Sequence, residues 1–198
     1  MDIERRAFVV EGLKVEKRAD GKAVLRGHAA VFGQLSEDLG GFREQIVAGA
    51  FLEAIEKDDV RALFNHDPNF VLGRNRAKTL LLSEDSRGLA IEIDPPDNDT
   101  VRHLVLQPIE RGDVSQMSFG FSVRPGGQDW AKDDEGRTIR TLKKVRLFDV
   151  SPVTFPAYPQ TDIAVRELRA WQAAAAPDPE KLAARRRFLN ALQRDAAV

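Results

Sequence analysis

Apolar and polar residues alternate along most of the chain, and this period of two predicts a mainly β fold with peripheral helices, of the α+β class. The segments that fit strands are 7–15, 22–32, 60–65, 80–83, 89–93, 117–123 and 138–150. Helical spacing of apolar residues predicts short helices over 49–57, 99–110 and 163–171. Segment 125–136 is rich in glycine and aspartate and is expected to form a loop.

Turn and cap residues set the boundaries of several of these elements. Asp20-Gly21 predicts a hairpin turn between the first two strand segments. Asn98 or Asp99 is expected to cap the start of the 99–110 helix, and Gly112 to end it. A second hairpin is expected around 85–88.

Composition limits the class of protein. With 198 residues, 42% hydrophobic and 31% charged, the chain fits one soluble globular domain with a short appendage. The absence of cysteine excludes a disulfide scaffold, a thiolate nucleophile and a cysteine-based zinc site. A net charge of −1 does not favour direct binding to nucleic acid, and no apolar run approaches the roughly 20 residues that cross a bilayer.

The character of the chain changes towards its C-terminal end. We expect one folded domain over 1–172, a flexible linker over 173–180 and a helical tail over 181–198. The tail carries the basic run Arg185-Arg186-Arg187 and few apolar residues. Because so thin an apolar stripe does not hold a short helix alone, the tail is expected either to dock on a partner or to fray.

Three polar side chains interrupt apolar, strand-forming segments, namely His66, Ser118 and Asp149. A serine hydroxyl needs an imidazole to take its proton and a carboxylate to orient that imidazole, so this set has the parts of a serine hydrolase. Around Ser118, residues Met117 and Phe119 have one parity in the strand, whereas Ser118 and Gly120 have the other. We expect Ser118 to be half-exposed and Gly120 to leave room beside it for a substrate backbone.

Other residues of the same types remain open as alternatives. The competing bases are His28 and His103, the competing nucleophiles are Ser115 and Ser122, and the competing acid is Asp67. Asp149 has a purely structural alternative as well, in which its carboxylate pairs with Arg146 or Lys144. The donors that would stabilise an oxyanion are open, with backbone N–H groups near Phe119 or the side chain of Arg124 as candidates.

Five segments in order give the chain a resemblance to a known family. They are Gly27-His28-Ala29-Ala30-Val31-Phe32-Gly33, Glu44-Gln45-Ile46-Val47-Ala48-Gly49-Ala50-Phe51, Leu63-Phe64-Asn65-His66-Asp67, Gln116-Met117-Ser118-Phe119-Gly120-Phe121, and Phe148-Asp149-Val150-Ser151-Pro152-Val153-Thr154-Phe155-Pro156-Ala157. With these segments the chain resembles the prohead (capsid maturation) proteases of tailed bacteriophages over roughly residues 5–165.

The resemblance implies a fold shared with the herpesvirus capsid maturation proteases, a β-barrel with peripheral helices. It implies a Ser118–His66 pair completed by Asp149, and no cofactor. The implied activity is serine endopeptidase cleavage of the scaffolding region of the major capsid protein, and of the protease itself. We therefore expect the capsid protein as partner, a dimer as the assembly state, and a location inside the assembling procapsid in the host cytoplasm. The alternative is a catalytically inactive capsid-assembly or scaffold protein with the same fold.

Overall fold

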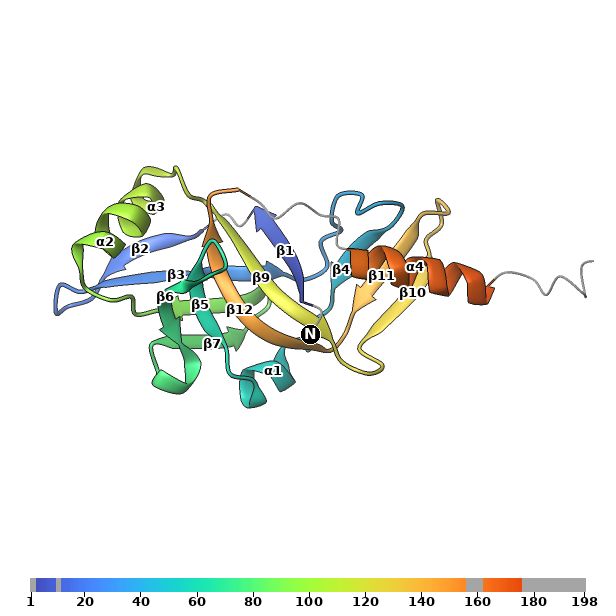
Figure 1. Cartoon of the computed structure of the whole chain (residues 1–198), viewed down its shortest axis with the longest axis horizontal. Helices are drawn as coiled ribbons and strands as arrows, with labels where there is room; N and C mark the ends of the chain where they lie inside the picture. The colour runs from blue at the N-terminus through green and yellow to red at the C-terminus, as the bar shows by residue number, and fades with distance from the viewer. Residues whose placement is uncertain (1–2, 10–11, 156–161, 176–198) are drawn as a thin grey trace, which may run out of the picture. The chain divides into compact units, whose positions relative to one another are not determined.

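The structure is a computed structural model that describes residues 3–9, 12–155 and 162–175. The chain divides into two compact units, Met1–Ala164 and Val165–Val198. The described strands all belong to the first unit, where they form three sheets with short helices at their margins (Figure 1). The prediction of a mainly β fold with peripheral helices is therefore confirmed.

The largest sheet has five strands and carries the candidate site. Its order is β1 (Glu4–Val9), β9 (Gln116–Val123), β12 (Val145–Val153), β5 (Arg61–Phe64) and β6 (Asp67–Arg74). Strand β12 (orange) runs antiparallel to β9 (yellow) and parallel to β5 (Figure 1). Three segments that lie far apart in the sequence therefore meet on adjacent strands.

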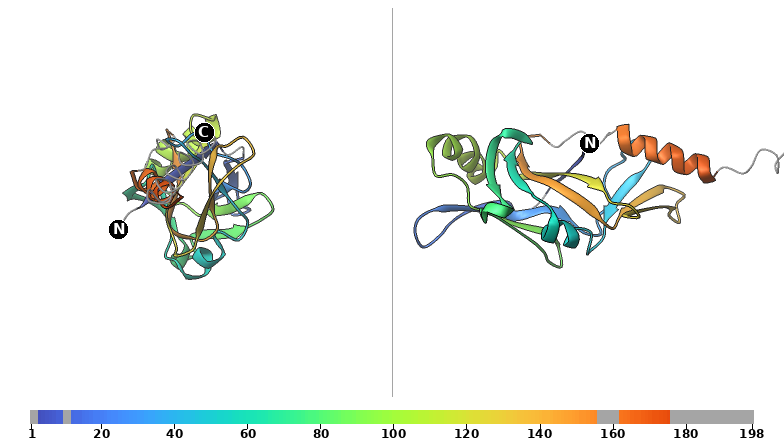
Figure 2. Two further views of the ribbon diagram at one scale, coloured as in Figure 1. Left: turned by 90° about the vertical axis from the view of Figure 1, so that its right-hand side faces the viewer. Right: turned by 60° about the horizontal axis from the view of Figure 1, so that its bottom comes forward.

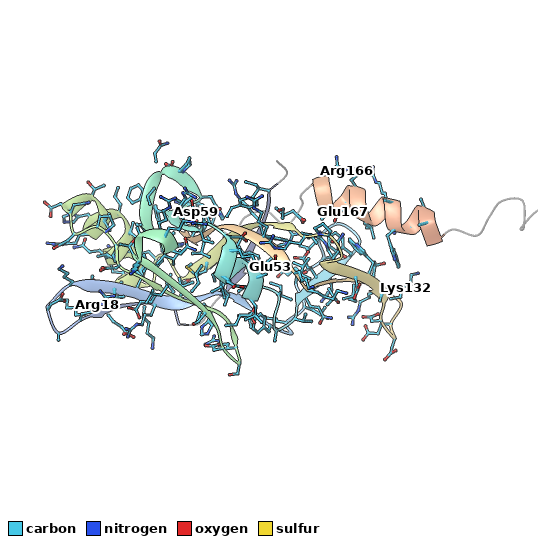
Figure 3. The ribbon with its side chains drawn as sticks, turned by 90° about the horizontal axis from the view of Figure 1, so that it is seen from below. Arg18, Glu53, Asp59, Lys132, Arg166 and Glu167 are labelled. Atoms are coloured by element: carbon cyan, nitrogen blue, oxygen red, sulfur yellow. The ribbon has the colours of Figure 1, made fainter. Side chains whose placement is uncertain are left out.

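Two smaller sheets complete the first unit. One has the order β2 (Lys14–Lys17), β3 (Ala23–Val31), β8 (Gly88–Ile93) and β7 (Leu80–Glu84), and contains both predicted hairpins. The other has the order β10 (Gln128–Lys132), β11 (Thr138–Leu142) and β4 (Arg43–Ile46), and Figure 2 shows β4 (blue) beside the β10–β11 hairpin (gold). Apolar residues of all three sheets pack into one core that includes Phe51, Phe119 and Phe121, whereas charged side chains such as Arg18 and Lys132 lie at the periphery (Figure 3).

The closed β-barrel that the resemblance implied is not formed by the described residues. A barrel requires the first and last strands of a sheet to hydrogen-bond to each other. In the five-stranded sheet β1 and β6 remain edges, and the strands divide among three open sheets. The segment 7–15, which was expected to be one strand, is divided near Gly12, where φ is 116°. Its two parts, β1 and β2, belong to different sheets.

The short helices begin and end at identifiable residues. Helix α1 (Leu52–Lys57) follows Gly49 and Phe51, whose backbone N–H groups each donate to the carboxylate of Glu84 at 2.7 Å. The predicted 99–110 helix is a continuous run of α2 (Asp99–Val101), the π-helical turn η2 (Arg102–Leu106) and α3 (Gln107–Arg111). As predicted, Asn98 caps its start by accepting from Val101 N at 2.9 Å, and Gly112 ends it with φ of 84°. A 3₁₀ turn, η1 (Asn75–Ala77), follows β6.

Two expected elements differ from the structure around Gly127. The expected 125–136 loop contains β10, and the expected 138–150 strand is divided into β11 and β12. The carbonyl of Gly127 accepts from both Lys143 N and Lys144 N, at 2.7 and 3.0 Å, which turns the chain between those two strands. A Cβ on residue 127 would lie 2.1 Å from the Lys144 carbonyl oxygen, so only glycine fits this crossing.

The second unit contributes α4, which spans Asp162–Ala175 and begins at the end of the first unit. It includes the predicted 163–171 helix and the first residues of the expected linker. The rest of that linker and the expected 181–198 tail lie outside the described residues. No helix among the described residues is both long and apolar enough to cross a membrane.

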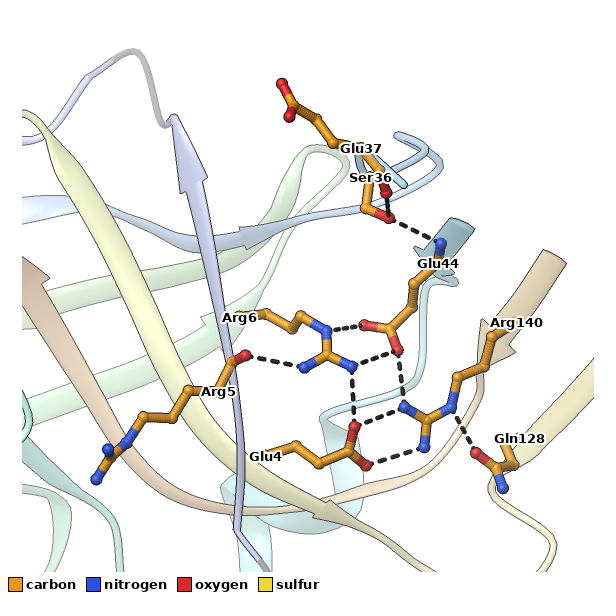
Figure 4. Close-up of polar contacts among 8 residues, drawn as sticks. All are labelled: Glu4, Arg5, Arg6, Ser36, Glu37, Glu44, Gln128 and Arg140. Carbon is orange, nitrogen blue, oxygen red and sulfur yellow. Dashed lines mark hydrogen bonds and ion pairs between the residues drawn. The ribbon is translucent and has the colours of Figure 1, made fainter. Parts of the chain in front are cut away.

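A buried cluster of four charges fastens β1 to the three-stranded sheet (Figure 4). The guanidinium of Arg6 donates to Glu44 and Glu4, and that of Arg140 donates to the same two carboxylates, at distances from 2.7 to 3.1 Å. All four side chains are almost inaccessible to solvent. Two positive and two negative charges balance one another, as buried charges must to avoid a large desolvation cost.

The cluster also links stability to pH through Glu4. Burial alone would raise the pKa of Glu4, but the hydrogen bonds and charges of Arg140 and Arg6 outweigh it and hold the pKa below its ordinary value. Because the pKa is lower in the folded than in the unfolded chain, the ionised Glu4 stabilises the fold at neutral pH. That contribution is lost as the pH falls through the lowered pKa.

We predict that Arg140→Met lowers the free energy of unfolding by about 3–5 kcal/mol, because it leaves two buried carboxylates with Arg6 as their only partner in the cluster, and one negative charge uncompensated. The matched control is Arg26→Met, which removes a half-exposed arginine that pairs with Glu16 and Glu92 and should cost less than about 1 kcal/mol. Urea unfolding of both variants at neutral pH measures the difference. Equal losses in the two variants would show that the buried cluster contributes no more than a surface ion pair.

Candidate active site

His66 lies in a two-residue turn between β5 and β6. Phe64 pairs with Asp67 across this turn, and the central residues Asn65 and His66 have φ of 55° and 58°. Two consecutive positive φ angles characterise a type I′ turn, the hairpin turn that matches the twist of paired strands. Asparagine and histidine are among the side chains that adopt this conformation most readily.

Asn65 fastens the turn to the end of β12. Its amide nitrogen Nδ2 donates to Thr154 Oγ1 at 3.1 Å, its Oδ1 accepts from Thr154 N at 2.8 Å, and its backbone N–H donates to the carbonyl of Pro152 at 3.0 Å. The turn that carries His66 is therefore held on the strand that carries Asp149. Sequence reasoning missed this role, although the polar Asn-His pair between two strand segments is a recognisable turn signal.

The imidazole of His66 lies between Ser118 and Asp149. His66 Nδ1 is 2.5 Å from Asp149 Oδ2, and His66 Nε2 is 2.7 Å from Ser118 Oγ. Since an ionised carboxylate only accepts hydrogen bonds, Nδ1 carries the proton that points to Asp149. Nε2 is then the acceptor for the hydroxyl proton of Ser118, which is the arrangement that a general base requires.

Asp149 occupies its position because of a bulge in β12 and a glycine in β9. The β12–β9 register shifts between Leu147 and Asp149, and Asp149 then lies directly opposite Gly120. A Cβ on residue 120 would lie 2.3 Å from Asp149 Oδ1. Gly120 therefore makes room for the carboxylate, which differs from our expectation that it makes room for a substrate backbone.

Asp149 is almost completely buried, at 7% exposure, and one oxygen of its carboxylate has two hydrogen-bond donors. Besides His66, the hydroxyl of Ser151 donates to Oδ2 at 2.7 Å. The expected structural alternative is not formed in the described residues: Arg146 stacks over the ring of Phe148, and no ion pair joins Asp149 to Arg146 or Lys144.

Asp58 holds the strand at the same bulge. Its Oδ2 accepts from Leu147 N at 2.9 Å, and its Oδ1 accepts from Arg124 Nη2 at 2.7 Å. Arg124 also donates to the carbonyl of Val145 at 3.2 Å. The Arg124 side chain is thus engaged at the start of β12, which argues against the role at an oxyanion that we considered for it.

Ser118 lies in the middle of β9, between Ala7 of β1 and Ser151 of β12. Its neighbours Met117 and Phe119 face the core, as the alternation predicted. The expectation that Ser118 is half-exposed was wrong, because the residue has 0% exposure. A substrate carbonyl therefore reaches Oγ only when neighbouring side chains move.

The competing residues are placed elsewhere. His28 Nε2 lies 2.8 Å from Asp85 Oδ2, and this hydrogen bond, together with backbone N–H groups of residues 87 and 88, lowers the pKa of Asp85 to about 2. His103 Nδ1 contacts the carbonyl of Asp99 within its own helix at 2.8 Å. Asp67 is exposed and accepts from Asn69 N at 2.8 Å in a local turn. The structure brings His66, Ser118 and Asp149 together, and not these alternatives.

No group of three or more histidine, aspartate or glutamate side chains within the described ranges is arranged to hold a metal ion. The three side chains that do meet supply a hydroxyl whose proton can pass to an imidazole that a carboxylate orients. Such an arrangement suits nucleophilic attack on a carbonyl carbon.

Comparison with known proteins agrees with this chemistry. A family model described as caudovirus prohead serine protease matches residues 11–174, a range that contains His66, Ser118 and Asp149. No curated protein and no solved structure matches the chain.

We predict that Gly120→Ala retains the fold but lowers hydrolysis of a p-nitrophenyl ester on the order of 10²- to 10⁴-fold, because the new methyl group displaces the Asp149 carboxylate that orients His66. The clash is with the end of a flexible side chain, so we expect little change in urea unfolding. Ser122→Ala, two residues along the same strand, is the matched control and should stay near wild-type activity. An active Gly120→Ala enzyme would mean that the position of Asp149 is unimportant.

Proposed function

Because the chain belongs to the caudovirus prohead serine protease family, we propose that it is a serine endopeptidase that cuts the scaffolding region of its phage's major capsid protein, and itself, during capsid maturation. Ser118 is the nucleophile, His66 the general base and Asp149 the orienting acid. The single observation that supports this assignment best is the position of the His66 ring, whose two nitrogens lie 2.5 Å from Asp149 and 2.7 Å from Ser118.

The reaction follows from these contacts. His66 Nε2 takes the hydroxyl proton as Ser118 Oγ bonds to the carbonyl carbon of the peptide, and the resulting imidazolium is stabilised by the Asp149 carboxylate. The same imidazolium then gives its proton to the leaving amine, which leaves an acyl-enzyme. Water then gives a proton to His66 Nε2 and bonds to the acyl carbon, the bond from that carbon to Ser118 Oγ breaks, and His66 returns the proton to Oγ.

The surroundings of the triad suit this sequence of steps. Ser151 donates to Asp149 Oδ2, the same oxygen that His66 Nδ1 contacts, so the carboxylate is held where it keeps the imidazole oriented. The turn at Asn65 and His66 is fixed by three hydrogen bonds to residues 152 and 154. A base that is held in place in advance needs little reorganisation when the proton moves.

The substrate assignment places the enzyme inside the procapsid, where the scaffolding region of the capsid protein is accessible. A catalytically inactive assembly protein would not need a buried carboxylate aligned with an imidazole and a hydroxyl, since each of these groups costs stability when buried. The intact set therefore favours the protease over the scaffold protein.

We predict that purified wild-type protein cleaves the unprocessed capsid protein and itself, whereas Ser118→Ala and His66→Ala do neither. Removal of the nucleophile or the base eliminates the covalent pathway, and the loss should reach on the order of 10⁶-fold. Gel electrophoresis with mass spectrometry of the fragments provides the measurement, and Ser122→Ala is the active control. Cleavage by Ser118→Ala would overturn the assignment, and the absence of cleavage by the wild type would favour the inactive assembly protein.

We also predict that kcat/KM rises with pH and reaches a plateau, because only the unprotonated imidazole can accept the serine proton. Cleavage of a capsid-protein fragment should be followed in buffers of constant ionic strength from pH 5 to 9. Protein unfolding at each pH serves as the control, since acid also weakens the Glu4 cluster. A rate that does not vary across this range would count against a histidine base.

A further inference from the structure

One side-chain amide near the nucleophile has a buried acceptor without a donor. Oε1 of Gln116, the first residue of β9, is buried and accepts no hydrogen bond from the part of the chain that the structure describes. Side-chain oxygens in such positions are nearly always hydrogen-bonded in native proteins. An acceptor left unpaired carries the full cost of its desolvation, so its presence calls for an explanation.

Gln116 lies on the same face of the sheet as the nucleophile. It precedes Ser118 by two residues in β9, and side chains two residues apart in a strand point to the same side, about 7 Å apart. On the neighbouring strand, Val153 is opposite Gln116, and Ser151 is opposite Ser118. The amide therefore belongs to the surface on which His66, Asp149 and Ser118 meet.

The polar groups nearest in the strand pairing are already engaged with other partners. The hydroxyl of Ser151 donates to Asp149, and the backbone N–H of Thr154 donates to Asn65. The fold thus uses its local donors to place the acid and the base. Gln116 is left with an unpaired acceptor, which, like the buried Oγ of Ser118, a bound molecule reaches only when neighbouring side chains move.

We propose that Gln116 is a substrate-binding residue, whose Oε1 accepts a hydrogen bond from a main-chain N–H of the bound polypeptide. This inference rests on the proposed endopeptidase function. An extended peptide offers an N–H group at each residue and rises about 3.3 Å per residue, so the contacted amide lies within about two residues of the bond that Ser118 attacks. A substrate N–H removes the desolvation cost that the free enzyme carries, and this adds to binding.

Gln116→Met should affect stability and substrate binding in opposite directions. Gln116→Met keeps the length of the side chain and removes the unpaired acceptor, so the urea midpoint should be unchanged or higher. The same change should weaken substrate binding about tenfold, the effect of one lost hydrogen bond of this kind. A residue with only a structural role would lose stability and leave binding unchanged.

Binding is measured by titration calorimetry of the unprocessed capsid protein with Ser118→Ala, which cannot cut it, and with Ser118→Ala combined with Gln116→Met. In the active enzyme, Gln116→Met should raise KM for the same protein about tenfold and leave the pH profile of kcat unchanged. The matched control is Gln45→Met, because Gln45 donates to Thr141 at 3.1 Å in the three-stranded sheet. Gln45→Met should lose some stability and keep both binding and cleavage.

A second experiment identifies which backbone N–H of the substrate donates to Gln116. In a capsid-protein fragment that the wild type cuts, N-methylation of one backbone amide should weaken cleavage by the wild type and have no further effect on Gln116→Met. Equal affinity of the two Ser118→Ala proteins overturns the inference. Equal affinity together with a loss of stability in Gln116→Met would show that the amide binds an internal water instead. Failure of the proposed function is distinct from this: the capsid protein would bind but the wild type would not cut it.

Discussion

The antiparallel pairing of β9 with β12 is the constraint on which the site depends. Its register places Ser118 opposite Ser151 and, beyond the bulge, Gly120 opposite Asp149. A strand pair without the bulge would turn Asp149 to the other face of the sheet, because a shift of one residue reverses every side chain. Asp58 holds the bulged strand by accepting from Leu147 N, and the missing Cβ of Gly120 leaves the space that the carboxylate fills.

Several features of this surface are unfavourable when considered alone. His66 has a left-handed backbone, Asp149 is a buried carboxylate, and Gln116 has an unpaired acceptor. The rest of the sheet offsets them with a shared apolar core and with the buried cluster of Glu4, Arg6, Glu44 and Arg140, which holds the edge strand β1 against β4 and β11. Local departures from ideal structure that gather at one place are typical of functional sites.

The sequence predicted the elements whose signals are local. The Asp20-Gly21 hairpin, the Asn98 cap and the alternation around Ser118 depend on neighbouring residues, and all three appear in the structure. It also pointed to His66, Ser118 and Asp149 as a set, but it could not predict their distances. Features that arise from contacts distant in the sequence were missed: the role of Gly120 depends on Asp149, β10 depends on β11, and the burial of Ser118 depends on its neighbours in space. The prediction of a closed barrel was wrong for the same reason, because closure depends on which edge strands meet in space.

We infer that His66 and Asp149 activate the hydroxyl of Ser118. The sharpest test exposes the folded protein to a small fluorophosphonate, which labels activated serines, and locates the adduct by mass spectrometry. We expect one adduct per chain, on Ser118, that forms in the wild type and in Ser122→Ala but not in His66→Ala. An adduct on another serine, or an equal rate of labelling in His66→Ala, would contradict it.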